Sequence, residues 1–157
     1  MEVRDPQSEE SKRGEEFERW CKDEITSSGS KAFFIWGLCG SPIHPAVGRC
    51  MDCILRSQRD GDIGIVSTGN LPALLFIEAK SFSPDHPDTI LINTMQHRYF
   101  RGPCRYYAIG EPGKVKIYRA DKVVNACALI EFGGEEKFQF NHTLTKPDYT
   151  SFYHFRD

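Results

Sequence analysis

Two neighbouring apolar segments that carry acidic residues constrain the fold of this chain most. They are residues 61–66 and 74–80, both short, rich in branched and aromatic side chains, and bounded by Gly, Asn, Pro and Ser. This pattern predicts two buried strands joined by a turn. Side chains alternate along a strand, so Glu78 and Lys80 should share one face. If the two strands pair as a hairpin, Asp62 lies beside them.

Charged groups inside an apolar strand cost free energy to bury unless something compensates them. A divalent cation such as Mg²⁺ or Mn²⁺ would compensate Asp62 and Glu78, because these ions prefer oxygen ligands. Lys80 could then orient or help deprotonate a water molecule, a combination suited to phosphodiester hydrolysis. The alternative is a surface salt bridge between Glu78 and Lys80 on a half-exposed strand. The apolar run before Glu78 and the upstream Asp62 favour the metal site.

This combination resembles the PD-(D/E)xK nuclease superfamily, in particular the archaeal Holliday-junction resolvases and related small endonucleases. In that family an acidic residue begins one core strand, and Glu-x-Lys ends the next. Asp62 and Glu78-Ala79-Lys80 match this pattern, whereas Gly61 stands where the family often has proline. The resemblance implies a metal site formed by Asp62, Glu78 and the backbone carbonyl of Ala79, with Lys80 positioning the attacking water.

Residues 12–20 resemble the first helix of the same family, in which a glycine is followed four residues later by a glutamate that completes the metal site. Gly14 and Glu18 have this spacing. The sequence itself predicts an amphipathic helix over about residues 14–26. Its apolar side comprises Phe17, Trp20, Cys21 and Ile25. Glu18 borders this side and could reach inward; alternatively, it is one of the acids that a helix N-terminus favours through its dipole.

Residues 88–101 predict a second helix that ends at a Gly-Pro pair. Gln96 occupies the place where the family often has a glutamine that touches the site. A solvated polar side chain is the alternative.

The expected fold class is α/β, with a restriction-endonuclease-like core of helix, three strands, helix and two strands over about residues 12–120. The remaining strands are expected at about residues 32–36, 105–109 and 114–118. We expect one domain, residues 1–157, with three additions to the core. These are a flexible segment at 1–11, a Cys-rich loop insertion at 38–58, and a C-terminal β extension at 121–157 that includes strands over 123–132 and beyond 138.

Three of the six cysteines cluster with one histidine in a stretch rich in Gly and Pro. This set resembles a tetrahedral zinc site, although its spacing is not that of a standard zinc finger. Free thiols in a reducing cytosol, or a disulfide, are the alternatives. Such a zinc ion would be structural and separate from the catalytic ion. The candidate ligands are Cys39, His44, Cys50 and Cys53.

The formal net charge of −2 argues gently against a strong DNA-binding protein. Basic and aromatic residues nevertheless interleave locally and could form a phosphate-facing rim, with ordinary solvated charge as the alternative. The candidate side chains are Arg49, Arg56, Arg59, Arg98, Arg101 and Arg105. No run is apolar and long enough to span a membrane, and the polar N-terminus is not a signal peptide, so an intracellular location is expected.

The sequence therefore predicts a divalent-metal-dependent endonuclease that hydrolyses phosphodiester bonds in nucleic acid, DNA rather than RNA. The resemblance also suggests branched or junction DNA as substrate and a homodimer as the assembly. Because positive charge is sparse, a targeting protein partner is a further expectation. Two alternatives stay open: a catalytically inactive nuclease fold that binds nucleic acid, and a zinc-containing interaction protein.

Overall fold

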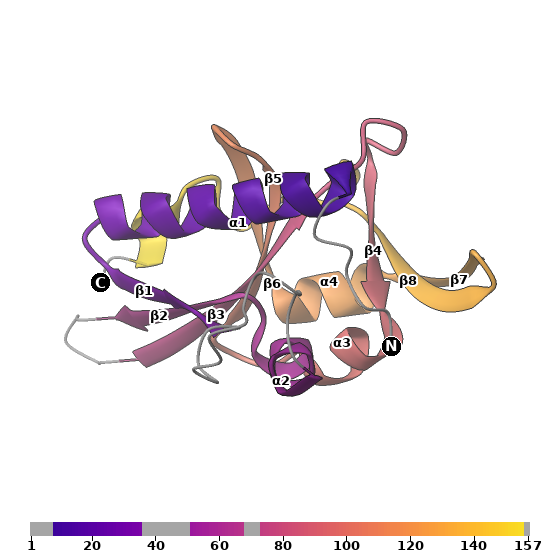
Figure 1. Ribbon diagram of the computed structural model, residues 1–157, viewed down its shortest axis with the longest axis horizontal. Coiled ribbons are helices and arrows are strands. Elements are labelled where there is room, and N and C mark those ends of the chain that lie inside the picture. The colour runs from indigo at the N-terminus through magenta and orange to yellow at the C-terminus, as the bar shows by residue number, and fades with distance from the viewer. Residues whose placement is uncertain (1–7, 36–50, 68–72, 156–157) are drawn as a thin grey trace.

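The computed structural model describes residues 8–35, 51–67 and 73–155 (Figure 1). In chain order the elements are α1 (Glu9–Ser27), β1 (Lys31–Phe34), α2 (Met51–Asp60), β2 (Ile63–Ser67), β3 (Ala73–Ser81), β4 (Thr89–Asn93), α3 (Thr94–Tyr99), β5 (Arg105–Glu111), β6 (Lys114–Arg119), α4 (Ala120–Ala126), β7 (Ala128–Phe132), β8 (Glu135–Asn141) and the 3₁₀ turn η2 (Phe152–Phe155). None of the helices in these ranges is both long enough and apolar enough to cross a bilayer.

The main sheet has five strands in the order β1-β2-β3-β5-β6. Strands β3 and β5 pair in parallel, and the other neighbours are antiparallel. A parallel pair needs a crossover, which the chain provides through β4 and α3. Ile63 of β2 lies opposite Ile77 of β3, so the two segments with acidic residues do pair as an antiparallel hairpin.

Helix α1 covers one face of this sheet (Figure 1). It begins earlier than expected because the side chain of Ser8 accepts a hydrogen bond from Ser11 N, at 3.1 Å, and caps the helix. The prediction that residues 1–11 are flexible is therefore wrong for residues 9–11, which are helical. The apolar stripe is as expected, since Phe17, Cys21 and Ile25 are fully buried against the sheet.

On the other face lie helices α2, α3 and α4 and a second sheet of order β4-β8-β7 (Figure 1). A second core fills the space between these layers. The expected C-terminal β extension is confirmed in β7 and β8. The strand predicted over residues 123–132 is wrong in its first half, because Val123 belongs to α4 and is buried there in the second core.

The helix predicted over residues 88–101 is also wrong in its first part, which is strand β4. Ile90 and Ile92 alternate inward as β4 pairs with β8, a partner about fifty residues away in the chain. Helix α3 begins only after Asn93, whose Oδ1 accepts a hydrogen bond from Gln96 N at 2.7 Å. Of the expected Cys-rich loop, residues 51–58 are helical instead, and the rest lies outside the described residues.

Candidate active site

Asp62 is held between two strands at the point where α2 gives way to β2. Its backbone N donates to Ile77 O at 2.8 Å, and its carbonyl accepts from Ile35 N at 2.9 Å. The turn before it needs a glycine: Gly61 has φ +77°, and a Cβ there would lie 2.7 Å from Ile77 O. The Asp62 side chain points inward, and only 3% of the residue is exposed.

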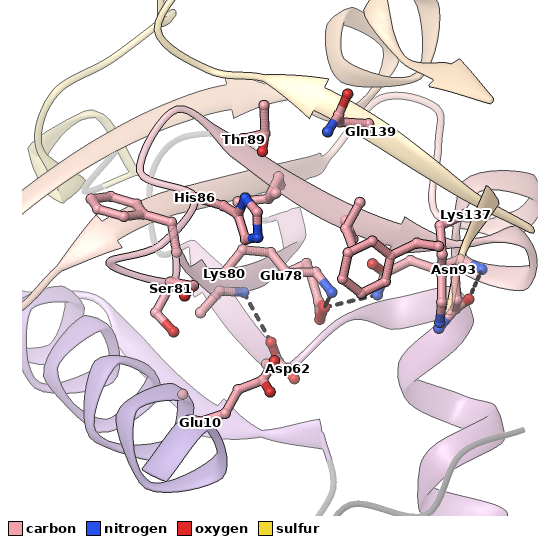
Figure 2. A pocket seen from close by; sticks show the side chains of 18 of the residues that line it. Glu10, Asp62, Glu78, Lys80, Ser81, His86, Thr89, Asn93, Lys137 and Gln139 are labelled. Atoms are coloured by element: carbon pink, nitrogen blue, oxygen red, sulfur yellow. Dashed lines mark hydrogen bonds and ion pairs between the residues drawn. The ribbon is translucent and has the colours of Figure 1, made fainter. Parts of the chain in front are cut away.

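Glu78 and Lys80 project from β3 on the same face, and Figure 2 shows both beside Asp62. The Asp62 Oδ2 atom accepts a hydrogen bond from Ala79 N at 2.9 Å, which ties the two strands together at the site. Lys80 Nζ lies 3.6 Å from Glu78 Oε2. The alternative of a half-exposed surface salt bridge does not describe this pair, because Glu78 is 5% exposed. The structure thus brings the three predicted residues together.

The electrostatics of Glu78 fit a cation ligand. Burial, followed by the nearby charge of Asp62, raises the pKa of Glu78 well above its ordinary value, while Lys80 and Gln96 act in the opposite direction. Glu78 Oε1 is buried and has no hydrogen-bond partner. An ionised carboxylate oxygen left in this way is costly, and a divalent cation would remove the cost.

The protein side of such a metal site would be sparse. Within residues 8–35, 51–67 and 73–155, no group of three or more His, Cys, Asp or Glu side chains is arranged to hold an ion. Two carboxylates supplemented by backbone and water oxygens match Mg²⁺, which usually keeps several waters and takes only one or two carboxylates. The donor set present therefore fits Mg²⁺ or Mn²⁺ better than a metal that needs an all-protein cage.

Gln96 touches the site from α3, as the resemblance implied. Its Nε2 donates to Glu78 Oε2 at 2.8 Å, and Tyr107 OH donates to its Oε1 at 3.4 Å. These contacts fix the orientation of the amide, and the residue is only 3% exposed. The alternative of a solvated polar side chain is wrong for Gln96.

Glu18 of α1 reaches inward rather than into solvent. It is 4% exposed and lines the same cavity as Asp62 and Glu78. Of the two interpretations of Glu18 offered by the sequence, burial favours the inward one.

The cavity has a volume of about 1260 Å³ and runs between the start of α1, the ends of β2 and β3, and the second sheet. Figure 2 shows His86, Thr89 and Gln139 across the space from Asp62. Seven carboxylates line it together with three Lys or Arg side chains. We refer to it below as the groove.

Several lining residues were not among the sequence candidates. The alternation of Thr89-Ile-Leu-Ile-Asn93, with its branched residues, was a signal for a strand that could have placed Thr89 and Asn93 on one face. His86 also lines the groove and stays exposed. Other lining residues that sequence reasoning missed include Arg13, Phe132, Lys137 and Gln139.

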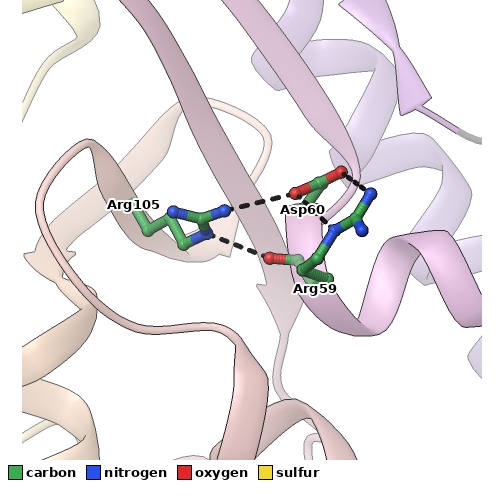
Figure 3. A network of polar contacts seen from close by, with 3 residues as sticks. All are labelled: Arg59, Asp60 and Arg105. Carbon is green, nitrogen blue, oxygen red and sulfur yellow. Dashed lines mark hydrogen bonds and ion pairs between the residues drawn. The ribbon is translucent and has the colours of Figure 1, made fainter.

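None of the candidate arginines in the described part of the chain lines the groove. Figure 3 shows that Arg105 donates to Arg59 O at 3.0 Å and to Asp60 Oδ1 at 3.3 Å, and Arg59 also pairs with Asp60. This network joins β5 to the end of α2, which is a structural role. Arg56 is half-buried, and Arg101, just beyond α3, donates to His97 O of that helix. Arg98 stacks over Tyr99, and Arg49 lies outside the described residues.

The candidate zinc ligands cannot be brought together from the described residues. Cys39, His44 and Cys50 lie outside them. Cys53 belongs to the first turn of α2 and is buried. Zinc binding stays a prediction.

Comparison with known proteins identifies no relative. No protein-family model matches the chain, and no curated protein or solved structure matches it either.

Proposed function

We propose that this protein is a divalent-metal-dependent nuclease of the PD-(D/E)xK type. The observation that carries the proposal is the buried pair of Asp62 and Glu78, with an unpartnered Glu78 oxygen, beside Lys80 in a groove. The element order gives further support. Without α2 and β4, the elements from α1 to β6 run helix, three strands, helix and two strands, which is the order of the restriction-endonuclease-like core.

In this proposal Asp62, Glu78 and the Ala79 carbonyl hold Mg²⁺ or Mn²⁺, and Glu18 contributes to the metal site or to the groups around it. When bound, the ion would lower the pKa of a water molecule and neutralise charge on the phosphate. Lys80, 3.6 Å from Glu78, positions the attacking water. Gln96 holds the Glu78 carboxylate in one orientation through its 2.8 Å hydrogen bond.

The water oxygen forms a bond to phosphorus in line with the bond that breaks. The 3′ oxygen leaves with a proton, and the 5′-phosphate stays on the other product, as the resemblance implies. DNA, including branched DNA, is the proposed polymer, and a homodimer, a targeting partner and an intracellular location belong to the same proposal. A structural zinc at Cys39, His44, Cys50 and Cys53 is a separate part of it.

The test is cleavage of labelled single-stranded, duplex, flap and four-way-junction DNA and of RNA, in Mg²⁺, Mn²⁺ and EDTA. Wild type should cut at least one substrate in a metal-dependent manner. Lys80→Ala should lose at least 100-fold in rate, an amount typical of a group that positions a proton transfer. The control is Lys114→Ala, an exposed lysine that does not line the groove. Absence of cutting in both metals, with binding retained, would favour the inactive scaffold.

A further inference from the structure

The second sheet forms the wall of the groove opposite Asp62 and Glu78. In β4 and β8, Ile90 and Phe140 face the core. Strand alternation turns the opposite face toward the groove, where Asn93 pairs across the strands with Lys137, and Leu91 with Gln139. This wall belongs to the additions that lie outside the expected core.

The side chains of the wall combine one lysine, two amides and an exposed aromatic ring with two carboxylates of β8, Glu135 and Glu136. Lys137 Nζ lies 3.4 Å from Glu135, and its side chain is 19% exposed. Gln139 offers both a donor and an acceptor. Phe132 is 51% exposed at the end of β7, and His86 meets its ring edge-on, with centroids 6.5 Å apart. Both rings line the groove. Aromatic faces stack on unpaired bases, polar side chains hydrogen-bond to base edges, and cations contact the phosphates.

The charge of the groove argues against an intact duplex as its occupant. A duplex presents phosphates over its whole outer surface, about one charge per 1.7 Å of helix axis. Seven carboxylates against three Lys or Arg side chains would repel such a surface, even with a divalent ion bound at Asp62 and Glu78. An unpaired strand can instead turn uncharged bases toward the wall and keep most of its phosphates in solvent.

We propose that the second sheet binds an unpaired, single-stranded segment of nucleic acid. A base stacks on Phe132, whose ring is braced edge-on by His86. Gln139 contacts a base edge, and Lys137 contacts one phosphate. The inference rests on the proposed nuclease function and gives its substrate class: nucleic acid that is single-stranded where it enters the groove, as in a single strand or a flap.

The test is binding of a fluorescein-labelled 12-nucleotide DNA, the RNA of the same sequence and the corresponding DNA duplex. Fluorescence anisotropy is measured in Ca²⁺ and in EDTA, and gels confirm that the probes stay intact. The DNA and RNA arms identify which polymer the wall accepts. The single strands should bind more tightly than the duplex.

Two matched pairs of variants locate the binding. Phe132→Ala should weaken single-strand binding by about 5- to 100-fold, the range for loss of one base–aromatic stack. Its control is Leu129→Ala, in the same strand and 57% exposed, which does not line the groove. Lys137→Gln should weaken binding and reduce the slope of log K against log salt by about 0.7, the value for one phosphate of a single strand. Lys114→Gln should change neither.

Cleavage of the same probes in Mg²⁺ and Mn²⁺ separates failure of this inference from failure of the nuclease proposal. If wild type cuts while Phe132→Ala and Lys137→Gln bind like their controls, the wall assignment is overturned and the nuclease stands. If these variants lose binding while wild type cuts nothing, the assignment of single-strand binding to the wall is supported and the nuclease proposal is contradicted. Tighter binding of the duplex, or no binding of any probe, also overturns the wall assignment.

Discussion

Glu78 sits almost fully buried beside Asp62, and its Oε1 atom has no hydrogen-bond partner. Without a cation, this arrangement costs the fold free energy, because two carboxylates oppose each other away from water. A residue that is costly to the free protein and useful once an ion binds is typical of a functional site.

Glu78→Gln should therefore stabilise the metal-free protein while abolishing cleavage. The neutral amide keeps the shape of the carboxylate, removes its charge and can donate to Asp62. At pH 8 in EDTA we expect a gain of about 1 kcal/mol or more, which corresponds to about 2–4 °C in melting temperature for a chain of this size. Thermal unfolding followed by circular dichroism measures it. A melting temperature below that of wild type would contradict the account of Glu78 as a strained carboxylate.

A substitution of Gln96 tests whether the Glu78 carboxylate must be held in one orientation. Gln96→Ala removes the 2.8 Å hydrogen bond to Glu78 Oε2, so the carboxylate loses its orientation. We expect a 10- to 100-fold loss in metal affinity or cleavage rate, as for other groups that orient metal ligands. The measurement is the cleavage rate over a Mg²⁺ titration. Gln96→Glu places a third carboxylate at the site and should not restore the rate; a wild-type rate in either variant would exclude the role.

At the scale of elements, the turn between α2 and β2 decides where Asp62 lies. Gly61 has φ +77° and no room for a Cβ. Proline, which the resembling family often carries here, has φ fixed near −65° and could not form this turn. The backbone therefore requires glycine rather than proline at residue 61.

Gly61→Ala should destabilise the protein by about 2–4 kcal/mol, since it adds a clash with Ile77 O to the strain of a left-handed residue. The matched control is Gly29→Ala: Gly29 has φ +98° but nothing within 4 Å of a new Cβ. It should cost only about 1–2 kcal/mol, the conformational part alone. Urea unfolding of both variants measures the difference, and equal losses would show that the close approach at Gly61 is unimportant.

The same elements show what sequence could and could not predict. Strands β2 and β3 were predictable because their apolar runs and turn are local signals, and Asp62, Glu78 and Lys80 follow from alternation along them. Strand β4 was mistaken for helix, because its identity comes from pairing with β8, which no local pattern reports. The groove wall depends on that pairing, so Lys137 could not be placed near Glu78 from sequence.

At the scale of the whole molecule, the second sheet must stay attached to the main sheet for the groove to keep its shape. His142 directly follows β8 at this junction. Its carbonyl accepts from Tyr118 OH of β6 at 2.7 Å, and its ring stacks on Phe82 with centroids 5.1 Å apart. The ring is buried, and neither of its nitrogens has a hydrogen-bond partner. The junction therefore holds an imidazole whose neutral form is favoured.

This burial predicts how stability depends on pH. Desolvation, then the charge of Lys116, lowers the pKa of His142 below its ordinary value of 6.5, and the Pro87 backbone and then Asp88 oppose them only in part. The unfolded chain therefore binds more protons than the folded protein below about pH 6.5, so the stability due to neutral His142 is complete above that pH and is lost as the pH falls. The loss cannot exceed about 1.4 kcal/mol per pH unit for one group.

Urea unfolding at pH 7.5 and 5.5 should show a smaller decrease in His142→Leu than in wild type, because the variant has no imidazole to protonate at the junction. His86→Gln is the control, since His86 is exposed and its loss should leave the decrease unchanged. Titrating carboxylates contribute equally to the decrease in stability of all three proteins. The difference between the decreases of wild type and His142→Leu is therefore due to His142. Equal decreases in wild type and His142→Leu would mean that the junction between the two sheets tolerates a protonated histidine, and the groove should then keep its shape in acid.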